Sequence, residues 1–209
     1  MSIEAASGRD GFWTRVRVAL GRRPASAEPA YGQSAIAKSK NRPARMVDEE
    51  LRRGWALAGE RNVSLCAVAL ELDLYTEYFA AYGRESVDET LRTLDQTIRG
   101  LLTRPEDRCV RAGRAGFMLI LPDMPVTMAR DLCGRIAAAV RKCDLPNRQS
   151  HAGQVTLSVG LVAVNPHGSF DKGLPGQTAQ AVKKAQRRGI GRLEVVDLRG
   201  KPEKRKKAA

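Results

Sequence analysis

The chain has 209 residues and a hydrophobic content of 43%, which is enough for one domain of roughly 150 residues together with tails. No apolar run approaches the ~20 residues of a membrane-spanning helix, and the first residues lack the charged-then-apolar pattern of a signal peptide. The net charge of +13 is carried mainly by residues 1–45 (+6) and 199–209 (+5), which leaves about +2 for the middle. Because the basicity belongs to the ends, nucleic acid is disfavoured as a partner of the domain itself.

Residues 1–33 are predicted to be a basic, largely disordered tail that is rich in Ala, Ser, Gly, Pro and Arg. Within it, residues 11–23 place four apolar side chains on one helical face among arginines: Phe12, Trp13, Val16 and Leu20. Three interpretations stay open for this segment. It is a short amphipathic helix on an anionic membrane surface, a docking peptide for a partner groove, or a disordered tail with chance apolar residues.

The apolar periodicity of residues 34–198 predicts one domain. Its elements, in chain order, are a helix over 46–60, a strand over 63–72, helices over 74–82 and 86–102, a hairpin over 108–121, a helix over 127–143, a strand over 155–164, a helix over 176–188 and a strand over 193–196. Gly83 is predicted to end the short helix. The middle of this order is βαββαβ, which indicates an α/β (α+β) fold of the ferredoxin-like type.

Residues 199–209 form a second basic, disordered tail, which contains Lys204-Arg-Lys-Lys207. The four cysteines show no C-x-x-C pairing and no metal-ligand spacing with the two histidines, so no metal site is predicted from them. The four cysteines are Cys66, Cys109, Cys133 and Cys143. Because three of them lie in apolar segments, we expect reduced, buried thiols in a cytoplasm.

The hairpin is the most informative part of the chain. Gly113 and Gly116 permit the backbone angles of a tight turn, and the apolar run that begins at Phe117 suits a buried strand. Gly113-Arg114-Ala115-Gly116-Phe117 resembles the signature motif of the GGDEF family, the bacterial diguanylate cyclases. Four other segments resemble that family in the same order: Asn41-Arg42, residues 71–83, residues 155–160 and residues 181–189. The resemblance covers about residues 41–197 and implies a palm-like nucleotidyl-cyclase fold, with a central, mostly antiparallel sheet flanked by helices.

The same resemblance implies that the catalytic set is depleted. Asp73 stands where the family has its first metal-binding aspartate, but the two acidic positions of the hairpin are Ala115 and Gly116. The positions that contact substrate also differ, since Thr76, Phe79, Gln186 and Ile190 replace the family's lysine, asparagine, lysine and arginine, while Asp88 stands at a second guanine contact. Cyclisation with two metal ions needs clustered carboxylates and cations on the leaving phosphates. We therefore expect no enzymatic activity, no catalytic residues, no metal and no cofactor.

The inhibitory site of the family carries over better. Its R-x-x-D motif ends five residues before the hairpin motif, which corresponds to Arg104 and Asp107, and Arg135 falls where a second arginine completes the site. A guanidinium can stack on guanine and bind its O6/N7 edge, and a carboxylate can accept from guanine N–H groups. The resemblance thus implies cyclic di-GMP as the ligand, bound as a stacked dimer that can bridge two copies of the domain.

Alternatives stand beside these assignments. Arg104 and Asp107 flank a proline at a helix end, where a local salt bridge or turn uses the same residue types. Arg135 can be an ordinary exposed helix residue. Asp73 can cap the next helix, and Arg114 can pair with Asp73 in place of a metal ion.

Two functional hypotheses follow. In the first, the domain is a non-catalytic receptor for cyclic di-GMP that regulates an unidentified protein partner in bacterial second-messenger signalling. In the second, it is a ligand-independent interaction or localisation scaffold that acts through its basic tails, with contact to an anionic inner-membrane surface as one form. Under either hypothesis we expect a cytoplasmic protein.

Overall fold

The computed structural model describes residues 31–200, and within them the side chains of residues 44–200. The predicted helix over 11–23 and the basic tail from residue 201 lie outside the described residues. The helices are α2 (Tyr31–Glu60), α3 (Tyr75–Gly100), α4 (Val126–Lys142) and α5 (Leu174–Arg187). The strands are β1 (Leu65–Leu72), β2 (Arg108–Ala112), β3 (Gly116–Pro122), β4 (Leu157–Val164) and β5 (Leu193–Asp197).

The five strands form a single sheet in the order β2-β3-β1-β4-β5. The first three pairings are antiparallel, and only β5 runs parallel to its neighbour β4. Removing β5 leaves the βαββαβ order and strand arrangement of a ferredoxin-like fold, so this prediction is confirmed. At the end of β1, Glu71 lies opposite Gly116 of β3 and Ser158 of β4, which places three motif segments side by side.

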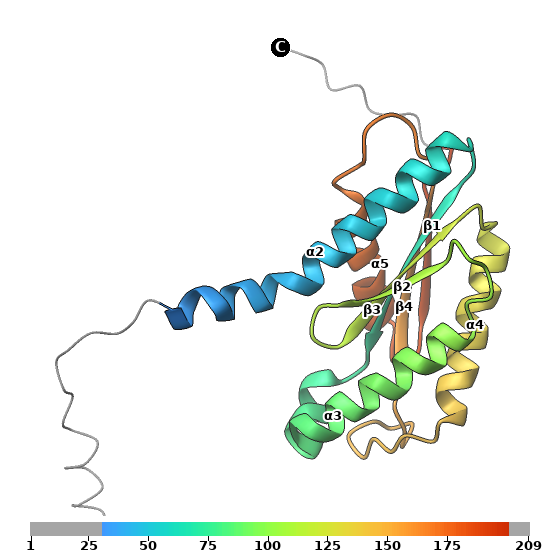
Figure 1. Cartoon of the computed structure of the whole chain (residues 1–209). Coiled ribbons are helices and arrows are strands. Elements are labelled where there is room, and N and C mark those ends of the chain that lie inside the picture. Colours follow the sequence, from blue (N-terminus) through green and yellow to red (C-terminus); the bar gives the residue numbers. More distant parts are fainter. Residues whose placement is uncertain (1–30, 201–209) are drawn as a thin grey trace, which may run out of the picture. The chain divides into compact units, whose positions relative to one another are not determined.

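Helices cover both faces of the sheet, with α3 and α4 on one side and α2 and α5 on the other (Figure 1). Successive side chains of a strand point to opposite faces, and β1 is buried on both. Cys66, Val68 and Leu70 pack toward α3 and α4, whereas Leu65 and Ala67 pack toward α2 and α5. Burial on both faces explains why β1, β3 and β4 read in the sequence as continuous apolar runs and not as alternating ones.

The predicted burial of three cysteines is confirmed. Cys66, Cys109 and Cys133 are buried and Cys143 is partly buried, and all four are free thiols. Burial raises the pKa of the Cys66 thiol to about 11 and that of Cys133 to about 12. These thiols therefore stay protonated at neutral pH and contribute to packing as small apolar groups.

One helix prediction needs correction, and another is confirmed. The first helix begins at Tyr31 and not at residue 46. The sequence does not predict this earlier start, because residues 31–45 have no apolar stripe. The two helices predicted over 74–82 and 86–102 are confirmed as the two helical segments of α3, which are separated by a kink at Gly83, whose φ of 75° and ψ of 177° are non-helical. Glycine reaches this conformation without a Cβ clash, and helical hydrogen bonding resumes directly after it.

The glycine of the segment 155–160 has a packing role. A Cβ on Gly160 of β4 would lie 2.4 Å from the backbone nitrogen of Val182 and 2.8 Å from the carbonyl oxygen of Thr178, both in α5. Only a residue without a side chain allows α5 to lie this close to the sheet. This close contact sets the position of α5, and therefore of Gln186 near its end.

None of the helices in the described part of the chain is long and apolar enough to cross a membrane.

Candidate functional site

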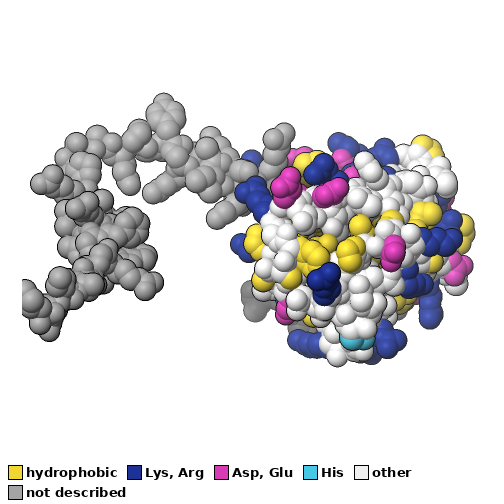
Figure 2. Space-filling view, turned by 90° about the horizontal axis from the view of Figure 1, so that it is seen from below, with side chains coloured by type: hydrophobic (Ala, Val, Ile, Leu, Met, Phe, Trp, Pro, Cys, Tyr) yellow, Lys and Arg dark blue, Asp and Glu magenta, His cyan; other side chains and the backbone are white. Residues whose placement is uncertain are grey.

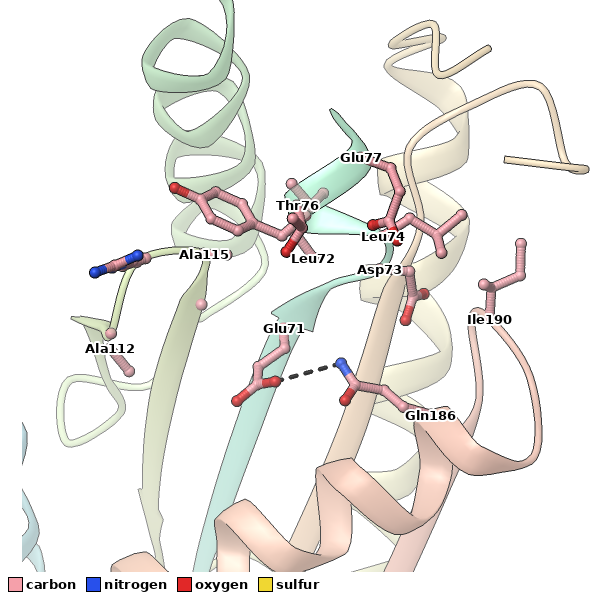
Figure 3. Close-up of a pocket in the computed structure, with 14 residues that line it drawn as sticks. Glu71, Leu72, Asp73, Leu74, Thr76, Glu77, Ala112, Ala115, Gln186 and Ile190 are labelled. Atoms are coloured by element: carbon pink, nitrogen blue, oxygen red, sulfur yellow. Dashed lines mark hydrogen bonds between the residues drawn. The ribbon is translucent and has the colours of Figure 1, made fainter. Parts of the chain in front are cut away.

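The first candidate site is a pocket of about 440 Å³ at the end of the sheet where β1 terminates. Its walls come from the end of β1, the first turn of α3, the tip of the β2–β3 hairpin, and α5 with the loop after it (Figure 3). The hairpin residues Gly113, Arg114, Ala115 and Gly116 line this pocket, and Phe117 is buried in the core behind it. The fold thus places the hairpin beside Asp73, as the resemblance implies.

The hairpin tip is held close to β1 through its backbone. The Leu72 amide donates to the carbonyl oxygen of Ala115 at 2.9 Å. A Cβ on Gly116 would lie 2.7 Å from the Leu70 carbonyl oxygen and 3.2 Å from that of Ala112, closer than a real side chain permits. The present hairpin geometry therefore requires glycine at position 116. This glycine also means that the position carries no carboxylate.

The carboxylate of Asp73 is buried and fully engaged. It accepts hydrogen bonds from the hydroxyls of Ser158 (2.6 Å) and Thr156 (2.8 Å) and from the backbone amide of Gly191 (2.8 Å). Two alternatives suggested by the sequence are wrong. Asp73 does not cap α3, whose N-terminus has no side-chain cap, and the described structure contains no ion pair between Asp73 and Arg114, because both carboxylate oxygens already have donors from the protein.

The pocket residues do not fit a pair of divalent metal ions. Hard cations require several free carboxylate or carbonyl oxygens, and the hairpin offers Ala115 and Gly116 in their place. Glu71 points into the same pocket, but its Oε2 accepts a 3.3 Å hydrogen bond from the Gln186 amide (Figure 3). Between residues 44 and 200, no three His, Cys, Asp or Glu side chains are grouped so that they could hold a metal.

The two remaining positions that the resemblance assigns to guanine, Phe79 and Asp88, do not line this pocket. Phe79 is 42% exposed and its ring lies 6.0 Å from that of Tyr75. Asp88, the second predicted guanine contact, lies 3.6 Å from Arg84 in an exposed ion pair. Seen from this end of the domain, the surface carries a band of hydrophobic side chains bordered by basic and acidic groups (Figure 2). An exposed aromatic ring cannot form the base-specific hydrogen bonds of an asparagine.

The second candidate site contains Arg104 and Asp107, in the loop between α3 and β2. Nε of Arg104 lies 3.5 Å from Oδ1 of Asp107. The other guanidinium nitrogens donate to backbone carbonyls at the end of β3, Nη1 to Asp123 at 2.8 Å and Nη2 to Pro122. Arg104 therefore binds the β3 terminus as well as Asp107.

The Asp107 carboxylate is buried without full compensation. Its side chain is only 2% exposed, and Oδ1 has no hydrogen-bond partner among the described residues. Burial raises the pKa of this carboxyl above its usual value, while the nearby Arg104 charge acts in the opposite direction. A buried carboxylate oxygen without a donor costs free energy, so this position is one where an additional N–H donor would be favourable.

Arg135, the third predicted ligand residue, lies on the exposed side of α4. Its guanidinium forms no ion pair or hydrogen bond with the side chains and backbone described. The structure therefore leaves Arg135 open to solvent, whereas Arg104 and Asp107 already contact each other.

Arg111 is a residue that the sequence interpretation missed. Its guanidinium stacks 4.7 Å from the ring centre of Phe117, and its Nη1 is buried without a hydrogen-bond partner. Burial lowers the pKa of Arg111 from its ordinary value. The strand alternation contains a signal for it, because Arg111 falls on the same face of β2 as the buried Cys109.

Comparison with known proteins agrees with this architecture. The family described as "Diguanylate cyclase, GGDEF domain" matches residues 39–192, and no curated protein sequence matches the chain. Several solved structures have a similar fold. The active GGEEF domain of a diguanylate cyclase from Vibrio cholerae is 22% identical, with a TM-score of 0.63 over 72% of this chain and 94% of that one.

The coiled coil and GGDEF domain of DgcB from Caulobacter crescentus, in complex with c-di-GMP, is 18% identical. The match to this structure covers 90% of the present chain and 100% of the DgcB chain, with a TM-score of 0.64. Diguanylate cyclase SiaD from Pseudomonas aeruginosa, in complex with its activator SiaC, is 20% identical over 90% of this chain and 81% of its own, with a TM-score of 0.61. These structures share the fold, and the family match spans most of the sequence. The chain belongs to the GGDEF domain family.

Proposed function

We propose that this GGDEF domain does not cyclise GTP and acts as a receptor for cyclic di-GMP. The first part rests on the pocket at the end of β1. The family's reaction needs metal-binding carboxylates and cations for the triphosphate, and this pocket has Ala115 and Gly116 in the hairpin and Gln186 and Ile190 on the opposite wall. Asp73, which stands at the family's first metal-binding position, directs both carboxylate oxygens to donors within the protein.

The observation that carries the second part is the unpartnered Oδ1 of Asp107 beside Arg104. A guanine base supplies both complements of this pair: N1–H and N2–H₂ donors for the carboxylate, and an O6/N7 edge for the guanidinium. Arg135 would neutralise a ligand phosphate as a charge-assisted contact. The similar structure of DgcB, solved in complex with c-di-GMP, supports this choice of ligand.

A partner protein would then read the bound state. The similar cyclase SiaD was solved with a protein activator, which supports the idea that domains of this fold are regulated through protein contacts. For the present chain the partner is an unidentified protein. A stacked ligand dimer that uses Arg104 of two copies would also bridge them into a homodimer.

Titration calorimetry of the full chain with cyclic di-GMP tests the receptor role. We expect micromolar or tighter binding, and at least a tenfold weakening in Arg104→Ala and Asp107→Asn, since a charged base contact contributes about 1–3 kcal/mol. Arg130→Ala is the matched control, because Arg130 is also exposed on α4 and belongs to neither site. No heat with the wild-type chain, or binding that is indifferent to Arg104, would leave the ligand-independent scaffold acting through its basic ends.

The absence of catalysis is tested separately. The full chain is incubated with GTP and Mg²⁺, or Mn²⁺, and the products are separated by chromatography. We expect no cyclic di-GMP above a no-protein blank. Product formation that depends on Asp73 would overturn the non-catalytic assignment, whatever the calorimetry shows.

A further inference from the structure

The turn between β3 and α4 is a second structural element in contact with the Arg104 loop. It consists of residues 122–125, and Asp123 within it has a φ of 52°, in the left-handed region that non-glycine residues seldom occupy. Such a conformation costs free energy and persists only where neighbouring contacts hold it. The contacts of this turn therefore decide whether it keeps its shape.

On its inner side, the turn is attached to the segment that begins β1. The Asp123 amide donates to the Ser64 carbonyl oxygen at 2.8 Å. The Met124 carbonyl oxygen accepts from the Cys66 thiol at 3.2 Å and from the Ser64 hydroxyl at 3.5 Å. Pro122 also pairs with Leu65 in the sheet, and the Met124 side chain is buried in the core, so the inner side of the turn is held by packing as well as by these hydrogen bonds.

On its outer side, the turn is held by Arg104. The two Nη groups of one guanidinium donate to the carbonyl oxygens of Pro122 and Asp123, which are the two residues where β3 ends. Hydrogen bonds from an ionised donor are stronger than those between neutral groups. Arg104 thus ties the loop between α3 and β2 to the turn that leads into α4, and α4 is the helix that carries Arg135.

We infer that Arg104 is a releasable strap: ligand binding draws its guanidinium away from the Pro122 and Asp123 carbonyls and loosens the start of α4. The inference rests on the proposed function. Bidentate recognition of a guanine edge uses adjacent N–H groups of a single guanidinium, and the turn carbonyls occupy both Nη groups. The other bidentate edge of the guanidinium includes Nε, which faces Asp107 at 3.5 Å. A base that binds the edge formed by the two Nη groups, and that leaves Asp107 as its second contact, therefore competes with the turn for these donors.

Release also alters the Asp107 environment. With Arg104 strapped to the turn, Oδ1 of Asp107 has Nε at 3.5 Å and no hydrogen-bond donor. A base that takes the guanidinium brings N–H donors to that oxygen at the same time. The ligand thus supplies a donor to the unpartnered Asp107 oxygen as it displaces Arg104 from the Pro122 and Asp123 carbonyls. The backbone that loses these contacts is the turn 122–125 and the start of α4.

Hydrogen exchange of the full chain, followed by mass spectrometry, tests the strap at two amides with defined acceptors. The Asp123 amide reports on the turn through its bond to Ser64, and the Ala129 amide reports on the first turn of α4 through its bond to Pro125. We expect Arg104→Ala to speed exchange over residues 122–129 about tenfold without any ligand, as loss of one charged contact implies. Arg130→Ala should leave this segment unchanged, and Arg104→Lys should fall between.

Saturating cyclic di-GMP should speed exchange over the same segment in the wild-type chain, toward the rate of Arg104→Ala, and should change nothing further in that variant. Calorimetric binding with unchanged or slower exchange over residues 122–129 would overturn the strap and leave the receptor role intact. Unchanged exchange in Arg104→Ala would also overturn it. If no binding is detected, the receptor role and ligand-driven release both fail.

Discussion

Ser158 donates a 2.6 Å hydrogen bond to the Asp73 carboxylate, across 85 positions of sequence and from the neighbouring strand. The Thr156 hydroxyl and the Gly191 amide are the other two donors to this carboxylate. A carboxylate that would serve as a metal ligand in an active relative is here a junction between β1, the segment before β4 and the loop after α5.

Replacement of Asp73 should therefore affect stability and not activity. Asp73→Ala removes the acceptor of three donors, two of them on residues that are buried or partly buried, and we expect a loss of about 3 kcal/mol in the free energy of unfolding, since hydrogen bonds to charged groups contribute about 1.5–3 kcal/mol each. Urea denaturation measures it. The control is Asp88→Ala, whose exposed pair with Arg84 at 3.6 Å should contribute less than about 1 kcal/mol. Equal stabilities of the two variants would contradict the structural role.

Restoring acids to the hairpin should fail for a steric reason. Gly116→Glu places a Cβ 2.7 Å from the Leu70 carbonyl oxygen, and relief requires the hairpin backbone to shift, at a cost of about 1–3 kcal/mol. Ala115→Asp alone should fold, because that residue already carries a Cβ at the pocket wall. We expect both variants to remain without cyclase activity in an assay with GTP and Mg²⁺. Thermal melts distinguish them, and an unchanged melting temperature for Gly116→Glu would refute the steric argument.

The contact between β4 and α5 predicts a large effect of one methyl group. In Gly160→Ala the new Cβ would meet backbone atoms of Val182 and Thr178 at 2.4 and 2.8 Å, so we expect a loss of about 3 kcal/mol or more. Gly134→Ala in α4 is the matched control, because nothing lies within 4 Å of its Cβ position and alanine is favoured in a helix by about 0.5–1 kcal/mol. The two substitutions should thus shift the denaturation midpoint in opposite directions.

The raised pKa of Asp107 predicts a pH dependence of stability. Burial favours the protonated carboxyl in the folded state, so the folded protein binds more protons than the unfolded chain and loses stability as pH rises from the unfolded pKa through the folded one. Asp107→Asn removes this loss. We expect the variant to gain stability relative to wild type between about pH 3 and pH 7, values that bracket the ordinary Asp pKa of about 3.9. Urea denaturation at both pH values measures the gain. If the difference in stability between Asp107→Asn and wild type is the same at both pH values, the pKa of the Asp107 carboxyl is the same in the folded and unfolded states.

Much of the fold could be predicted from local pattern. The strands β1, β3 and β4 are long apolar runs bounded by turn residues, and the hairpin is marked by Gly113 and Gly116. The beginning of α2 was missed because residues 31–45 are largely polar, and a helix without an apolar face leaves no periodic signal. The sequence also predicts the break at Gly83, because glycine tolerates the positive φ that ends the first helical segment of α3.

The site divides in the same way. Composition alone determined that the hairpin lacks carboxylates at Ala115 and Gly116, because the absence of a functional group does not depend on geometry. The sequence also predicted the βαββαβ order of elements and the resemblance to the family, whereas the order of strands in the sheet came from the structure. Residue type could not say what the retained groups bind: Asp73 is satisfied by donors 83 to 118 positions away, and Arg104 is held by the end of β3. Those partners are set by strand pairing and loop closure, and only the tertiary structure brings them within hydrogen-bond distance.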